Sequence, residues 1–203
     1  MSVICPTDFI GEKPYSGLTA AYHTKSGVDI PKISIRKFGK GGRFAMADFF
    51  SEFRNDHRFV LRTLVDIRKA VDAGEYARAR ELVEALDNAA GPHMEFEECF
   101  LYPSLAPLIG DERVNSLISD HKGAAELLHK AKEVLNKGQL SEDEISFLHK
   151  FVQEFLQHAS DCEGTALLAE ALPEEKVKEF GEQLVALRSK GKPLTVYKGV
   201  AVG

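Results

Sequence analysis

Residues 93 to 103 read HMEFEECFLYP, a stretch that places a histidine and a carboxylate on the apolar face of a predicted helix. A helix advances about 100° per residue, so His93 shares its face with Phe96, Glu97 and Phe100. Buried polar groups cost free energy unless they find partners. This stretch therefore predicts a helix whose interior face carries polar groups for a purpose other than packing.

Helical periodicity extends outward from this stretch over most of the chain. It predicts helical segments over residues 46–73, 75–108, 111–137 and 141–172, separated by Gly74, Gly110 and Gly138. Ser141 and Glu144 form a capping-box pattern at the start of the last of these segments. Connections this short place consecutive helices antiparallel, so the sequence predicts an all-α, up-down-up-down four-helix bundle.

The predicted bundle occupies residues 46–172 and is flanked by two other parts. Prolines and clustered glycines predict an irregular N-terminal extension over residues 1–45. A short helix and a tail are expected over residues 173–203. Within the second segment, Gly91 and Pro92 predict a kink or a break.

Each of the four predicted helices carries one histidine in the middle of its apolar stripe. These are His57, His93, His121 and His158. One such histidine is usually a hydrogen-bonded core residue, because a neutral imidazole needs only two partners. Four of them, one from each helix, favour a shared metal site, since the interior of a bundle is where facing helices assemble such sites.

The position of Glu97 indicates which kind of metal site the four histidines would form. It follows His93 by four residues, so both side chains lie on one helix face and can bind a common ion. Its second oxygen can reach another ion. Histidine with a bridging carboxylate suggests two hard or borderline divalent ions, with iron first and manganese or zinc behind it.

The order and spacing of these residues resemble the hemerythrin-like (HHE cation-binding) family. The matching elements are DH at Asp56–His57, HxxxEE with a following YP at His93–Pro103, DH at Asp120–His121 and HxxxxE at His158–Glu163. The resemblance covers residues 46–172 and implies a non-haem centre with two iron ions. The ligands that it implies are His57, His93, Glu97, His121, His158 and Glu163, with the two glutamates as bridges.

The chain departs from the hemerythrin pattern at two places. Ala125 stands where hemerythrin has a second histidine on the third helix, and His129 stays open as a replacement. Glu163 lies about 140° round a regular helix from His158, so a local π-bulge near Gly164 is expected. Asp161 and Cys162 stay open as alternatives to Glu163; as a ligand, Cys162 would shift the metal preference toward zinc or a modified iron site.

The composition limits the cellular location and the classes of binding partner that we expect for this protein. The net charge is -5, which gives no reason to expect nucleic-acid binding, and no apolar run is long enough to predict a membrane anchor. The three cysteines form no CxxC pair and predict neither a disulfide framework nor a zinc ribbon. A reducing compartment, and hence a cytoplasmic location, fits best.

The predicted site favours a protein that binds or senses oxygen or a related small ligand such as peroxide or nitric oxide. The first alternative is a di-iron oxidoreductase acting on the same small molecules, favoured by the coordination position that Ala125 leaves open. Another is an iron storage or donor protein, and a metal-free helical interaction module is the weakest. The sequence identifies no redox partner.

Overall fold

The computed structural model describes residues 48–200, and the expected irregular extension over residues 1–45 lies outside them. The helices are α1 (Phe49–Asp72), α2 (Tyr76–Phe96), the π-helical turn η2 (Glu97–Leu101), α3 (Tyr102–Ile109), α4 (Asp111–Leu135), α5 (Glu142–Ala166), the 3-10 turn η3 (Leu167–Ala171) and α6 (Glu174–Lys190). No helix of the described part is long and apolar enough to cross a membrane.

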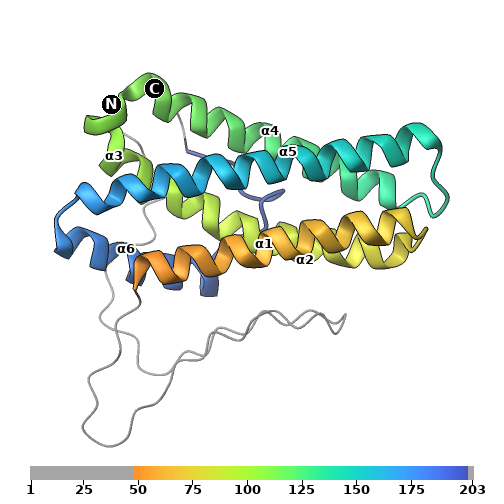
Figure 1. Ribbon diagram of the computed structural model, residues 1–203, viewed down its shortest axis with the longest axis horizontal. Helices are drawn as coiled ribbons and strands as arrows, with labels where there is room; N and C mark the ends of the chain where they lie inside the picture. The colour runs from red at the N-terminus through yellow and green to blue at the C-terminus, as the bar shows by residue number, and fades with distance from the viewer. Residues whose placement is uncertain (1–47, 201–203) are drawn as a thin grey trace, which may run out of the picture.

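Four long helices lie alongside one another and form the bundle (Figure 1). Helix α1 packs against α2 and α5, and α4 packs against α2 and α5, which closes the ring. Helix α6 lies outside this ring, on α1 and α2. Gly110, between α3 and α4, has a φ of 81°, a left-handed conformation that only glycine adopts readily, so the chain reverses there in one residue. The predicted all-α bundle is confirmed.

Two apolar clusters fill the interior, and the four histidines lie between them along the chain. One cluster is built around Leu64, Leu86, Leu128 and Phe151. The other is built around Phe49, Phe96, Tyr102 and Phe180, and it includes the inner face of α6. Each bundle helix passes from one cluster to the other close to its inward histidine. The polar side chains therefore form one layer across the bundle, with apolar packing on both sides.

The structure contradicts the break expected at Gly91 and Pro92, because α2 runs through both residues to Phe96. Gly91 has a different role. A Cβ atom at this position would lie 1.9 Å from the backbone oxygen of Lys192, so only glycine allows the C-terminal segment to cross α2 here. On the opposing segment, a Cβ at Gly191 would lie 2.5 Å from the ring of Pro92. The Gly-Pro pair is thus a docking point for the chain that follows α6.

The structure contains a π-helical irregularity, but at a different position from the one that the sequence predicted. The π-bulge expected beside Glu163 is absent, because α5 is a regular α-helix from Glu142 to Ala166. Instead, η2 is π-helical from Glu97 to Leu101, and the amide of Tyr102 donates to the carbonyl of Glu97, five residues back. A π turn holds more residues than an α turn and often occurs at functional sites. It is also where two successive glutamates, Glu97 and Glu98, are both buried.

Candidate metal centre

The structure brings the four inward histidines together in the polar layer, one from each of α1, α2, α4 and α5. The Nε2 atoms of His57 and His93 lie 3.1 Å apart, and the rings of His121 and His158 have centroids 5.0 Å apart. Their ligand atoms fall into two groups in which every atom lies within 4.8 Å of the others. The first group is His57, His93 and Cys162, and the second group is Glu97, His121 and His158.

Glu97 belongs to the second group but also lies close to His93 of the first group, and it has no solvent exposure. Its Oε2 atom is 3.6 Å from Nε2 of His93 and 3.4 Å from Nε2 of His121, and its Oε1 atom is 2.6 Å from Sγ of Cys162. Burial raises the pKa of Glu97, but the charges of His93 and His121 outweigh it and hold the pKa well below its usual range. A carboxylate that reaches both groups is placed to bridge two ions.

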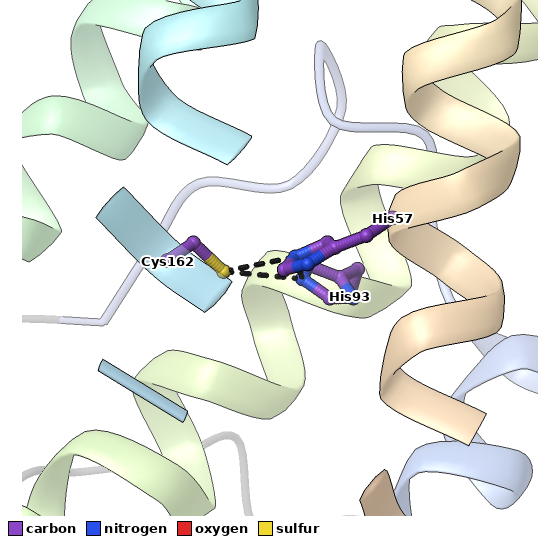
Figure 2. Close-up of side chains that lie close together, drawn as sticks. All are labelled: His57, His93 and Cys162. Atoms are coloured by element: carbon purple, nitrogen blue, oxygen red, sulfur yellow. Dashed lines mark hydrogen bonds between the residues drawn. The ribbon is translucent and has the colours of Figure 1, made fainter. Parts of the chain in front are cut away.

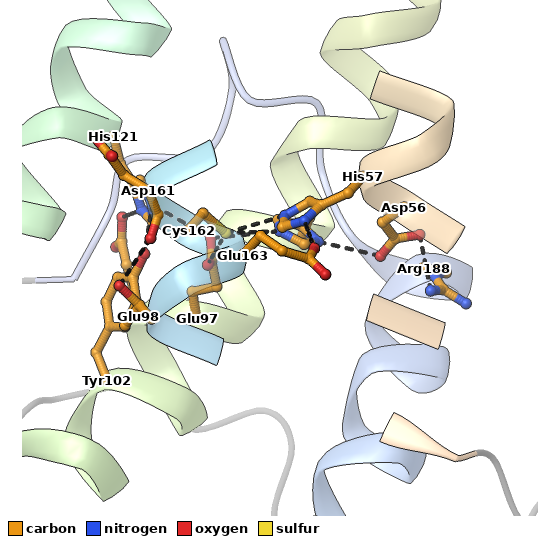
Figure 3. Close-up of polar contacts among 12 residues, drawn as sticks. Asp56, His57, Glu97, Glu98, Tyr102, His121, Asp161, Cys162, Glu163 and Arg188 are labelled. Atoms are coloured by element: carbon orange, nitrogen blue, oxygen red, sulfur yellow. Dashed lines mark hydrogen bonds and ion pairs between the residues drawn. The ribbon is translucent and has the colours of Figure 1, made fainter. Parts of the chain in front are cut away.

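Carboxylates on the outer side fix the orientation of three of the imidazoles (Figure 3). Nδ1 of His57 contacts Glu163, Nδ1 of His93 is 3.2 Å from Asp56, and Nδ1 of His121 is 2.8 Å from Glu98. An ionised carboxylate only accepts hydrogen bonds, so each Nδ1 carries a proton and each Nε2 faces the interior. Metal-binding histidines are usually held in this way.

Each orienting carboxylate stands next in sequence to a residue of the two groups. The pairs are Asp56–His57, Glu97–Glu98 and Cys162–Glu163. Both members of a pair contact one imidazole, with the orienting carboxylate at Nδ1 and its sequence neighbour at Nε2. Asp56 of α1 therefore holds the histidine of α2, Glu98 of η2 holds that of α4, and Glu163 of α5 holds that of α1. These contacts tie the helices to one another around the layer.

The histidines differ in their protonation because their surroundings differ. Burial lowers the pKa of His121, but the neighbouring carboxylates of Glu97 and Glu98 outweigh this effect and raise the pKa to about 9. Burial, followed by the positive charge of His121, lowers the pKa of His158 to about 4. Burial, followed by His93, also lowers the pKa of His57. Neutral His57 and His158 therefore offer free nitrogen lone pairs to a cation.

Two buried atoms of the second group lack hydrogen-bond partners. They are Oε2 of Glu97 and Nε2 of His158. Both are acceptors or ligand atoms, and both belong to the set that also contains His121. Leaving such atoms unpaired in the interior costs roughly 1–3 kcal/mol each. A cation bound by this group would satisfy both, so the residues present fit the metal that the sequence predicts.

The other predicted or alternative ligands lie apart from the interior face of the histidines. Glu163 contacts Nδ1 of His57 and lies 3.4 Å from Arg54, with its side chain 37% exposed. Asp161 is exposed and accepts a hydrogen bond from Gln157. His129 is also exposed and pairs with Glu133. Glu163 belongs to neither group, and its role as a ligand stays a prediction, as do those of the four histidines and Glu97.

The two described cysteines differ in their bonding state, since one is a free thiol and the other is in a disulfide. Cys162 is free and 1% exposed, and its Sγ atom belongs to the first group. Cys99 is disulfide-bonded, which the sequence did not indicate. The spacing of the cysteines carried no signal for either outcome, because both depend on which side of a helix faces which neighbour.

Sequence reasoning missed several residues that support the centre. Arg188 of α6 is buried, lies 2.8 Å from Asp56 and donates to the backbone oxygen of Glu52. The Tyr102 hydroxyl lies 3.1 Å from Nε2 of His121. Tyr197 donates to Glu98, the carboxylate that orients His121. An arginine in the last turn of a helix gives no signal of this role, since such residues usually interact with the helix end.

A helical bundle with two groups of buried histidines on either side of an inward carboxylate defines a metalloprotein of the four-helix-bundle class. The family model for the hemerythrin HHE cation binding domain matches residues 48–169, and the chain belongs to this family. The resemblance drawn from the sequence is therefore confirmed. No curated protein and no solved structure matches the chain. The domain is a cation-binding domain, and the two groups are its candidate metal ligands.

Proposed function

We propose that this protein holds a non-haem di-iron centre that binds or senses oxygen or a related small ligand, such as peroxide or nitric oxide. The observation that carries the proposal is the position of Glu97. It is a fully buried carboxylate with an unpaired oxygen, flanked by imidazoles on both sides. A cation on each side of Glu97 would neutralise this charge and use both of its oxygens.

The residues divide naturally between two ions. His57 and His93 would hold the first, His121 and His158 the second, and Glu97 would reach both. Iron, when bound, supplies coordination positions and one-electron chemistry that no side chain offers. Asp56, Glu98 and Glu163 keep the histidine Nε2 atoms directed inward, which fixes the geometry before the metal arrives.

Apolar surroundings support a small uncharged ligand. The ring of Phe53 lies 4.6 Å from the rings of both His57 and His93, centroid to centroid. Phe96 and Phe49 lie behind it in the same apolar cluster. Walls of this kind exclude water and offer no partner for a charged or extended substrate. These apolar surroundings suit a diatomic molecule or a peroxide as the ligand.

A di-iron oxidoreductase acting on oxygen, peroxide or nitric oxide is the second candidate, and Ala125 favours it. This residue stands on α4 one turn after His121, and its methyl group packs against the apolar cluster. A methyl group provides no ligand where hemerythrin has a histidine. The ion beside His121 would therefore keep an additional position open to a reactant.

Anaerobic loading of the full chain with ferrous iron tests the proposal. We expect about two irons per chain, as in carboxylate-bridged two-metal sites, and charge-transfer absorption in the near ultraviolet after oxidation. Oxygen that is released again under vacuum supports binding or sensing, whereas steady turnover of oxygen or peroxide supports the oxidoreductase. Release of iron to a chelator without an oxygen adduct indicates storage or donation. A chain that stays free of iron after loading overturns all three.

A further inference from the structure

Cys162 lies in the polar layer of the bundle, where its sulfur atom is close to two of the four histidines. It follows His158 by four residues on α5, and its Sγ atom lies 3.1 Å from Nε2 of His57 and 3.6 Å from Nε2 of His93 (Figure 2). The two Nε2 atoms are 3.1 Å apart. Three helices, α1, α2 and α5, thus each direct one soft or borderline donor atom at a common point.

Hydrogen bonding alone leaves this triangle unsatisfied. Glu163 and Asp56 accept from the Nδ1 atoms of His57 and His93, so both Nε2 atoms are lone-pair acceptors facing each other. The single thiol proton of Cys162 can serve only one acceptor at a time. Oε1 of Glu97, 2.6 Å from Sγ, competes for the same proton. Acceptors therefore outnumber the one donor in a place that water does not reach.

The distances match those around a single metal ion. An ion bound tetrahedrally by two imidazole nitrogens at about 2.05 Å and a thiolate at about 2.3 Å separates the nitrogens by about 3.3 Å and nitrogen from sulfur by about 3.6 Å. The corresponding distances here are 3.1 Å between the nitrogens and 3.1 and 3.6 Å to the sulfur. Two of the three distances lie within about 0.2 Å of the metal-bound values, and the distance between His57 and Cys162 is about 0.5 Å shorter.

We infer that Cys162 is a metal ligand, and that with His57 and His93 it forms one of two chemically different metal positions in this protein. The inference rests on the metal centre of the proposed function and adds a sulfur ligand to it. On binding, the S–H bond breaks, the sulfur–metal bond forms and the proton passes to solvent, with no change in the oxidation state of the metal. The second position, with Glu97, His121 and His158, has only nitrogen and oxygen ligands.

A thiolate changes which ions the first position prefers. Sulfur ligands favour zinc and similar ions over manganese, whereas carboxylate and imidazole discriminate less. The first position is therefore expected to prefer zinc over manganese by a larger factor than the second. Cys162, and not Glu163, completes the histidine pair, because the carboxylate of Glu163 is already on the Nδ1 side of His57.

Cobalt titration of the metal-free full chain under anaerobic conditions tests the inference. Thiolate bound to cobalt gives charge-transfer absorption in the near ultraviolet, which nitrogen and oxygen ligands do not. We expect this absorption to appear in the natural chain and to be lost in Cys162→Ser, which still binds cobalt at the second position. Absorption that survives in Cys162→Ser, or cobalt binding by the natural chain without the absorption, overturns the inference. If the natural chain binds cobalt without this absorption, the proposed metal centre is retained and only the thiolate ligand is rejected. If the chain binds no cobalt, both the inference and the proposed metal centre are rejected.

Glu163→Gln is the matched control, since it changes the next residue and the competing ligand. We expect it to keep the thiolate absorption and to weaken cobalt binding by about 10–100-fold, as for other residues that orient a metal-binding histidine. Loss of cobalt from the first position in Glu163→Gln, with unchanged binding at that position in Cys162→Ser, would assign the ligand to Glu163 instead. If Cys162→Ser fails to fold, X-ray absorption at the zinc edge of the natural chain decides. A sulfur neighbour at about 2.3 Å supports the inference, and a shell of nitrogen and oxygen alone overturns it.

Discussion

The two ligand groups lie on either side of Glu97, yet they are supported by different parts of the chain. In the first group, Asp56 holds His93 and is in turn held by Arg188 of α6. In the second group, Glu98 holds His121 and is in turn held by Tyr197 in the segment after α6. Two halves of one centre thus depend on two successive pieces of the C-terminal region.

This difference shows how a bundle places two unlike groups of candidate metal ligands around similar histidines. The histidines come from equivalent places on their helices, but the outer contacts and the remaining ligand atom are not equivalent. A thiol faces the first pair and a carboxylate faces the second. Substitutions in each group and in its supporting residues test whether the two groups are as separate as these contacts indicate.

The largest effect is expected from removing one histidine of each group. His57→Ala removes a ligand of the first group and His121→Ala one of the second, and we expect each to reduce bound metal from about two ions to about one, since each position keeps its own ligands. Elemental analysis after dialysis measures this. His149→Ala is the control, because that histidine pairs with Asp72 at the surface. If either of the first two variants binds no metal at all, the two groups act as one site.

A smaller effect is expected from the orienting carboxylates. Asp56→Asn weakens the hold on His93 and Glu98→Gln the hold on His121, and each should lower zinc affinity by about 10–100-fold at its own position only. Competition with a chromophoric chelator resolves the two binding steps. Asp66→Asn on α1 serves as the control, since Asp66 forms an exposed ion pair with Lys69. Equal weakening of both steps by Asp56→Asn would show that the supports are shared.

The smallest effect is expected from the C-terminal segment. Tyr197→Phe removes one hydrogen bond to Oε2 of Glu98, while the amide of Val200 still donates to the same atom. A net hydrogen bond contributes about 1 kcal/mol, or about fivefold in affinity, so we expect the zinc affinity of the second position to fall by that factor. Tyr76→Phe, at the far end of α2, makes the same chemical change away from the centre. A loss in the first position and not the second would contradict the proposed division.

Much of the fold followed from the sequence because its signals are local. The apolar period, the glycine turns and the capping box of Ser141 and Glu144 predicted helix limits that the structure matches closely. The convergence of the four histidines followed as well, since an inward residue on each helix of a bundle has few other places to go. The family motifs covered the same region, and the family match confirms them.

The errors concern places where a distant segment overrides a local signal. Gly91 and Pro92 would end an isolated helix, but here they receive the backbone of residues 191–194. The backbone irregularity occurs at Glu97 and not beside Glu163. The π turn directs Glu98 toward His121, a contact that helical spacing by itself does not predict. None of these contacts can be recognised from the amino acids that neighbour the contacting residues in the sequence.

The sequence by itself determined the helices, the buried face of each and the histidine layer, because these depend on the period of side chains along one helix. Only the tertiary structure decided which carboxylate orients which imidazole and that Cys162, more than Glu163, faces the histidine pair. It also decided that Arg188 and Tyr197 support the two groups. The physical reason is that these contacts join residues far apart in the chain, and their geometry depends on how the helices pack and not on the spacing within any one of them.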